Sequence, residues 1–288
     1  MCTISGKGRV KMVTVDSNSR IDFLRKKALW VRKETLKIHK IAQETRIASS
    51  LSAVEIFTVL YYGKILSYDA KDPAWEGRDR FIVSKGHGAI SLYPILADLG
   101  YFDKKELNNV CHEGTFLGGI PDSLIPGFET INGSLGHGPG VACGIALALK
   151  RKKAREVVFV LLGDGELYEG SVWEAIMFAG EHKLDNLILI LDNNHICMLD
   201  YCEKILDMSP LEEKFKSFKW DVVTLDGHDV NQLYDSFISL KKERNHRPKL
   251  LIANTVKGKG VHSLEKDPLC HIKNVKPADI DKILEELA

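Results

Sequence analysis

The sequence lacks the features that mark membrane-spanning, secreted and nucleic-acid-binding proteins. In its 288 residues no apolar run reaches the ~18 residues of a transmembrane helix. No apolar secretory segment opens the chain and no two cysteines have CxxC spacing, which indicates free thiols and predicts a cytoplasmic protein. The formal net charge is only +1, so charge favours neither nucleic acid nor a membrane surface as a partner. The six cysteines are Cys2, Cys111, Cys143, Cys197, Cys202 and Cys270.

What is present is the composition of an ordinary globular protein. Hydrophobic residues make up 44% of the chain and charged residues 27%, which allows a full apolar core. A chain of this length forms one large domain or two small ones, and no internal repeat divides it. Residues 1–20 are polar and irregular, and we expect them to form an extended lead-in to a domain that spans residues 21–288.

The first part of that domain is predicted to be helical. Apolar residues recur at helical spacing over residues 20–43 and 52–62. Ser52 and Glu55 have the spacing of a capping box, which predicts the start of the second helix.

A short apolar run at residues 80–83 ends in a glycine loop, and from residue 157 onward apolar runs alternate with helical patterns. Apolar strands that alternate with helices predict an α/β fold, with a mostly parallel sheet covered by helices on both faces. The expected strands are residues 80–83, 157–163, 186–194, 220–227 and 248–255, and the clearest helices between them are 171–182 and 229–243.

Unusual loops follow four of these strands. They are "SKGHG" (84–88), "GDGE" (163–166), "DNNHI" (192–196) and "TVKGKG" (255–260). The carboxyl ends of parallel strands meet at one edge of a sheet, where such folds bind their ligands. We therefore expect the functional site at this edge.

Two of the loops suggest a metal site. Asp164 ends one strand, and Asn193 and Asn194 end the next one along the chain, after a helix. A right-handed crossover brings these two ends together, so a carboxylate, an amide oxygen and a backbone carbonyl converge there. Mg2+ or Ca2+ prefers such oxygen ligands, and Mg2+ often completes its shell with phosphate. Gly163 and Gly165 would let backbone N–H groups approach that phosphate.

The stretch "GDGELYEGSVWEAIMFAGEHKLDNLILILDNN" resembles the thiamine diphosphate binding motif, and in detail the transketolase family. Four further stretches agree with that family in order: "SSLSAVEIFTVLYYG", "RDRFIVSKGHGAISLYPILADLGYF", "INGSLGHGPGVACGIALALK" and "ANTVKGKGV". The resemblance runs from about residue 25 to 275 and covers only the family's first, diphosphate-binding domain. The chain thus resembles the N-terminal subunit of a split transketolase.

This resemblance implies the roles of individual residues. The metal ligands would be Asp164, Asn194 and the backbone carbonyl of Ile196. The cofactor-binding residues would be His87, Gly136, His137, Gly163, Asp164, Gly165, Glu166, Asn194, Ile196, Lys257 and His271. The catalytic residues would be His87, His271, Glu169 and Arg46. Glu169 and Glu174 match acidic residues that link the two active sites of the family's dimer.

Three positions depart from the family pattern. Arg46 in "ETRIASSLS" and Ile120 in "GIPD" replace histidines that face the sugar donor, and His137 in "GHG" replaces a glutamine. A buried Ile120 offers no hydrogen bond to a ketose hydroxyl, whereas the guanidinium of Arg46 suits a carboxylate, phosphate or sulfonate. We therefore expect an altered donor. Alternatively, Arg46 points outward into a surface ion pair and the enzyme is an ordinary but weaker transketolase.

The implied reaction is transfer of a two-carbon ketol unit from a donor to an aldehyde acceptor, with thiamine diphosphate and Mg2+ (or Ca2+). A separate pyrimidine-binding subunit would supply the family's activating glutamate, in an α2β2 assembly. Two alternatives stay open. One is decarboxylation and carboligation of a 2-oxo acid, with Arg46 meeting its carboxylate. The other is a non-catalytic subunit that binds thiamine diphosphate.

Overall fold

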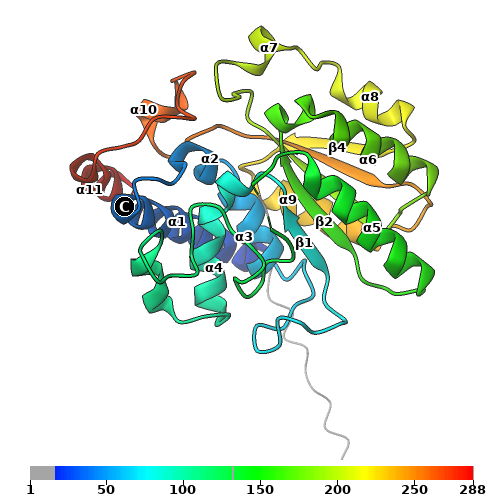
Figure 1. Cartoon of the computed structure of the whole chain (residues 1–288), viewed down its shortest axis with the longest axis horizontal. Helices are drawn as coiled ribbons and strands as arrows, with labels where there is room; N and C mark the ends of the chain where they lie inside the picture. The colour runs from blue at the N-terminus through cyan, green and yellow to red at the C-terminus, as the bar shows by residue number, and fades with distance from the viewer. Residues whose placement is uncertain (1–16, 132, 288) are drawn as a thin grey trace, which may run out of the picture.

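A computed structural model describes residues 17–131 and 133–287, and in these residues five parallel strands form one sheet. The strands are β1 (Arg80–Val83), β2 (Val158–Gly163), β3 (Leu187–Asn193), β4 (Asp221–Asp226) and β5 (Lys249–Asn254). Their spatial order is β1-β2-β3-β5-β4, so four strands that carry unusual loops are neighbours and β4 lies at the edge (Figure 1).

Helices cover both faces of the sheet, as the sequence predicts for an α/β fold. One face is covered by α1 (Ser17–Ile41), α3 (Val54–Tyr62), α4 (Leu92–Leu99) and α9 (Val230–Lys242). The other is covered by α5 (His137–Arg151), α6 (Gly170–Glu181) and α8 (Leu211–Ser217). The shorter elements are α2 (Ile47–Leu51), η1 (Gly86–Ser91), η2 (Lys104–Asn109), η3 (Asp164–Tyr168), α7 (Cys202–Ile205), α10 (His262–Glu265) and α11 (Pro277–Glu286).

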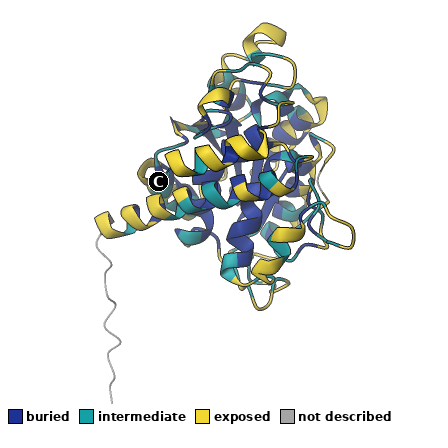
Figure 2. Cartoon of the chain, turned by 90° about the vertical axis from the view of Figure 1, so that its left-hand side faces the viewer, coloured by how far each residue is buried: buried dark blue, intermediate teal, exposed yellow. Residues whose placement is uncertain are grey.

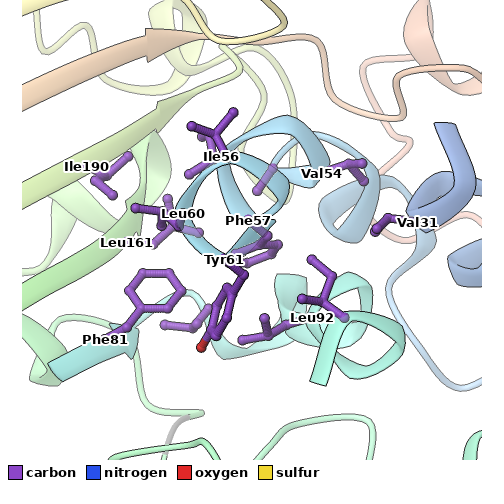
Figure 3. Packing of buried hydrophobic residues seen from close by; sticks show 14 of the residues in the cluster. Val31, Val54, Ile56, Phe57, Leu60, Tyr61, Phe81, Leu92, Leu161 and Ile190 are labelled. Carbon is purple, nitrogen blue, oxygen red and sulfur yellow. The ribbon is translucent and has the colours of Figure 1, made fainter. Parts of the chain in front are cut away.

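Strands β1, β2, β3 and β5 are mostly apolar because both faces of the sheet are buried there, whereas the edge strand β4 is partly exposed. Successive side chains of β2 enter different cores: Phe159 and Leu161 pack with α3, and Val160 and Leu162 pack with α5 and α6. Figure 3 shows α3 over the sheet, where the Phe57 and Phe81 rings meet edge-on at 5.9 Å between centroids. The buried residues lie inside and the exposed ones on the outer helix faces (Figure 2).

Within the described part of the chain, no helix is both long and apolar enough to cross a bilayer. The cysteines of that part are free thiols. The strand predictions are confirmed to within about one residue.

Two local predictions differ from the structure. Helix α1 begins at Ser17, so residues 17–20 are helical where we expected an extended lead-in, and residues 1–16 lie outside the described residues. The capping box is wrong. Helix α3 begins at Val54, and the hydroxyl of Ser52 donates to the buried Asp192, while Glu55 pairs with Arg32. Ser52 and Glu55 therefore bond to buried charged residues of other segments instead of capping the helix.

Helix α6 packs closely against the segment that follows α8. This packing predicts that one methyl group added to α6 at Gly180 lowers the stability of the fold. A Cβ atom on Gly180 would lie 1.9 Å from the backbone oxygen of Phe218, which cannot move aside cheaply. We expect Gly180→Ala to lower the free energy of unfolding by about 2–3 kcal/mol in urea titrations.

Gly144→Ala in α5 is the matched control, because no atom lies within 4 Å of its new Cβ. There the substitution should raise stability by about 0.5–1 kcal/mol through helix propensity. Equal effects of the two substitutions would contradict the packing described here.

Candidate functional site

The four predicted loops meet at one edge of the sheet. Gly163 of β2 pairs in register with Asp192 of β3, and Asn193 of β3 pairs with Asn254 of β5, so the residues that follow are neighbours. The loop after β1 continues into η1, the loop after β2 into η3, and the loop after β5 leads to α10.

Asp164 opens η3 and is only 7% exposed. Its two carboxylate oxygens accept the N–H groups of Gly165, at 2.8 Å, and of His195. His195 is in the left-handed region, with φ of 64°. Burial raises the pKa of the Asp164 carboxyl; the charge of Lys257 opposes this, while that of Asp192 adds to it. A cation at this carboxylate would offset the cost of its burial.

Two further oxygens accompany Asp164. Asn194 and Ile196 are buried, and the Asn194 side-chain oxygen accepts the Ile196 N–H at 3.3 Å. Residues 17–131 and 133–287 contain no cluster of three His, Cys, Asp or Glu side chains that would hold a metal. A cation here would therefore rely on one carboxylate, one amide oxygen and one backbone carbonyl, a donor set that fits Mg2+ completed by phosphate and water.

Cationic and imidazole groups lie beside these oxygens. The ammonium of buried Lys257 donates to the Ile196 carbonyl at 2.6 Å and to Nδ1 of His271 at 3.0 Å. The His87 and His271 rings are 5.0 Å apart between centroids. Burial, with the charge of Lys257 next, lowers the pKa of His271 to about 3, and burial with the charge of Lys85 lowers the pKa of His87. Both rings are therefore neutral near pH 7.

Hydrogen bonds to the carboxylates of Asp164 and Glu166 fix the conformation of the glycine loops. The N–H of Gly163 donates to Glu166 and that of Gly165 donates to Asp164. Each N–H group, which we expected to point toward a phosphate, therefore has a partner within the chain. Glu166 is buried and also accepts from the Ser84 hydroxyl and, at 2.8 Å, from the N–H of Gly136. Gly136 has φ of 84°, and a Cβ there would lie 2.7 Å from that of Glu169, so this position requires glycine.

The remaining predicted residues lie around this centre. Arg46 is exposed at the start of α2, near enough to His271 for its charge to help lower the pKa of that ring. His137, at the start of α5, is exposed, as are Glu169, the residue before α6, and Glu174 on α6. Ile120, which we expected to be buried, is 49% exposed, because no segment within residues 17–131 and 133–287 covers it.

One pair of charges was not predicted. Lys85 and Asp192 form an ion pair whose side chains are 2% and 0% exposed. Asp192 also accepts the hydroxyls of Ser52, at 2.6 Å, and Thr255. A signal did exist in the sequence: an aspartate that ends a fully apolar strand needs a buried cation, and "SKGHG" supplies the lysine at the neighbouring edge.

The hydrogen bond from Lys257 fixes the tautomer of His271. Because an ammonium only donates, Nδ1 of His271 accepts and Nε2 carries the proton. We expect the His271 signal in nitrogen NMR to report this neutral form from pH 8 to pH 5. The unfolded ring, with an ordinary pKa of 6.5, binds a proton below that pH, so stability should fall as the pH drops from 6.5 toward 3. His271→Asn identifies the signal, and protonation between pH 7 and 6 would refute this assignment.

Comparisons with known proteins agree with this geometry. Residues 31–288 match the family model described as the thiamine diphosphate binding domain of transketolase. The chain is 38% identical over 272 residues to one of the subunits of the apulose-4-phosphate transketolase of Actinobacillus succinogenes, covering 94% of this chain and 98% of that one. It is 36% identical over 245 residues to the 6-deoxy-6-sulfo-D-fructose transketolase subunit of a Clostridium species, covering 85% and 88% of the two chains.

The solved transketolase of Campylobacter jejuni has the same fold. It superposes with a TM-score of 0.85 at 30% identity, over 92% of this chain and 42% of that one. The chain thus corresponds to less than half of that full-length transketolase and to nearly all of the apulose-4-phosphate transketolase polypeptide. We conclude that this chain belongs to the transketolase family, as a transketolase-like transferase built on that family's thiamine diphosphate binding domain.

Proposed function

We propose that the edge of the sheet binds the diphosphate of thiamine diphosphate through Mg2+ held by Asp164, Asn194 and the Ile196 carbonyl. One observation carries this proposal. Three carboxylates are buried at the ends of β2 and β3, and Asp192 and Glu166 are satisfied by side-chain partners, whereas Asp164 receives only backbone N–H groups. Asp164 alone among them has capacity for a cation.

The other residues have complementary roles. Lys257 would neutralise diphosphate charge, and the neutral His87 and His271 rings would donate hydrogen bonds to it or to the donor sugar. Thiamine diphosphate supplies the carbanion chemistry of ketol transfer when it is bound. This chain binds and orients the diphosphate end and excludes water from it.

Removing the Asp164 carboxylate tests the site. We expect Asp164→Ala to abolish Mg2+-dependent binding of thiamine diphosphate, measured by calorimetry, because the amide and carbonyl alone do not balance the cation's charge. The fold should persist, as circular dichroism would report. Asp221→Ala is the control, since Asp221 begins β4 at the opposite end of the sheet. Unchanged affinity in Asp164→Ala would refute the site.

A separate partner polypeptide is the second part of the proposal. Large apolar side chains are exposed in the loops that flank the site, which supports a docking surface there. They are Leu124 (78%), Ile131 (77%), Leu199 (63%), Met198 (56%) and Ile272 (52%). The partner would carry the pyrimidine-binding domain and the activating glutamate, in an α2β2 assembly in the cytoplasm, with exposed Glu169 and Glu174 linking the two sites.

The donor is proposed to carry an oxyanion. Arg46 lies on the His271 side of the site, and its guanidinium forms no ion pair with the residues that the structure describes. This favours a substrate-facing role over a surface ion pair. Two relatives are named for sugars with a phosphate or a sulfo group, which supports a ketose phosphate or sulfonated ketose as the donor class.

A substrate panel on the complex of this chain with its partner tests this role. We expect Arg46→His to lower kcat/KM for the preferred anionic ketose about tenfold or more, because the bidentate contact is lost, and to change that for an uncharged ketose little. The panel holds xylulose 5-phosphate, fructose 6-phosphate, a sulfonated ketose, an uncharged ketose and 2-oxo acids, and the two polypeptides assayed separately are the controls. Equal effects on charged and uncharged donors would contradict this role, and preference for 2-oxo acids would favour the carboligase alternative.

A further inference from the structure

The loop that carries Lys257, residues 255–260, is held by hydrogen bonds to its backbone at several positions along its length. Its first N–H group, that of Thr255, donates to the Asn193 carbonyl at 3.1 Å, and the N–H of Gly258 donates to the Ala48 carbonyl at 3.0 Å. Between them, the N–H of Val256 donates to Nε2 of His228 at 2.8 Å. This last contact comes from the end of β4, a strand whose loop the sequence did not implicate.

His228 is the outer member of a largely buried chain of three hydrogen-bonded side chains. Its Nδ1 atom lies 2.9 Å from one oxygen of Glu55, and the other oxygen of Glu55 pairs with Arg32. The three side chains are 13%, 11% and 6% exposed, respectively. Burial alone would raise the pKa of Glu55, but the charge of Arg32 and the bond from His228 hold it below its usual range. The carboxylate is therefore ionised.

This arrangement dictates the tautomer of His228. Nε2 accepts from Val256, so the proton of the neutral ring sits on Nδ1 and is donated to the Glu55 carboxylate. The carboxylate thus orients the ring, and the ring offers one acceptor to the loop.

Arg32 holds the far end of the same loop. Its Nη1 atom donates to the Lys259 carbonyl at 2.6 Å and to the Leu51 carbonyl at 2.9 Å. Gly260 has φ of 88°, and a Cβ there would lie 2.6 Å from Cδ of Arg32, so the arginine packs directly on the loop backbone. The two ends of this chain, His228 and Arg32, therefore hold the loop by hydrogen bonds on either side of Lys257.

We propose that Arg32, Glu55 and His228 form a positioning triad that fixes the loop of residues 255–260 and so aims the Lys257 ammonium at the diphosphate subsite. The aim toward diphosphate rests on the proposed function; the hold on the loop does not. The triad itself touches no reacting atom.

Two substitutions of His228 separate its two bonds. The amide of glutamine reaches the position of Nε2 and keeps an acceptor for Val256, whereas that of asparagine reaches only Nδ1 and keeps the donor to Glu55. Lys241→Met is a control for general destabilisation. It leaves the buried Asp79 carboxylate without its ion pair at the opposite end of β1.

The first measurement is hydrogen–deuterium exchange of the full chain. We expect His228→Asn to speed exchange in the peptide over residues 255–260 at least tenfold, because the partly buried Val256 N–H loses its acceptor. His228→Gln and Lys241→Met should leave exchange there within about threefold of the wild type. Equal exchange in the Asn and Gln variants, whether fast or slow, would overturn the triad.

The second measurement is calorimetry with inorganic pyrophosphate and Mg2+. His228→Asn should weaken binding about tenfold and His228→Gln much less, with Lys241→Met unchanged despite its lower stability. Equal affinity of the Asn and Gln variants for pyrophosphate would contradict the proposal that the triad positions Lys257 to bind diphosphate. If the wild type binds no pyrophosphate while the exchange pattern holds, the triad stands and the proposed diphosphate site fails.

Discussion

The functional edge of the sheet is organised around one buried carboxylate, that of Asp192 at the end of β3. It pairs with Lys85 after β1 and accepts hydroxyls from Ser52 before α3 and Thr255 after β5. Loss of one member of a buried ion pair leaves an uncompensated charge, which costs far more than the pair contributes. Asp192 therefore ties segments more than 100 residues apart in sequence into one rigid frame.

That frame explains why we propose Asp164, and not its neighbours, as the metal ligand. Glu166, two residues later, is also saturated, by Ser84 and two backbone N–H groups, and holds the start of α5 against β2. With Asp192 and Glu166 committed to structure, the neighbouring Asp164 is the buried acid with unmet demand for positive charge. The same edge thus separates structural carboxylates from the one that we propose as the metal ligand.

The sequence predicted what depends on local pattern and topology. Apolar runs located the five strands, and the parallel arrangement brought the loops of Asp164, Asn194 and Lys257 to one edge, as expected. It did not predict contacts set by side-chain reach across the fold. Glu55 was read as a helix cap because its partners Arg32 and His228 lie far away in sequence. Ile120 was expected to be buried because the family pattern describes a complete active site, whereas this chain alone leaves it exposed.

The central claim is that an all-oxygen site of this chain holds the metal that anchors the diphosphate. Paramagnetic resonance of Mn2+, a substitute for Mg2+, bound to the full chain with thiamine diphosphate tests it most directly. We predict strong phosphorus couplings from the diphosphate and no directly coordinated nitrogen, although His87, His195 and His271 lie in the surrounding loops. A directly bound imidazole nitrogen, or the absence of phosphorus coupling, would contradict it.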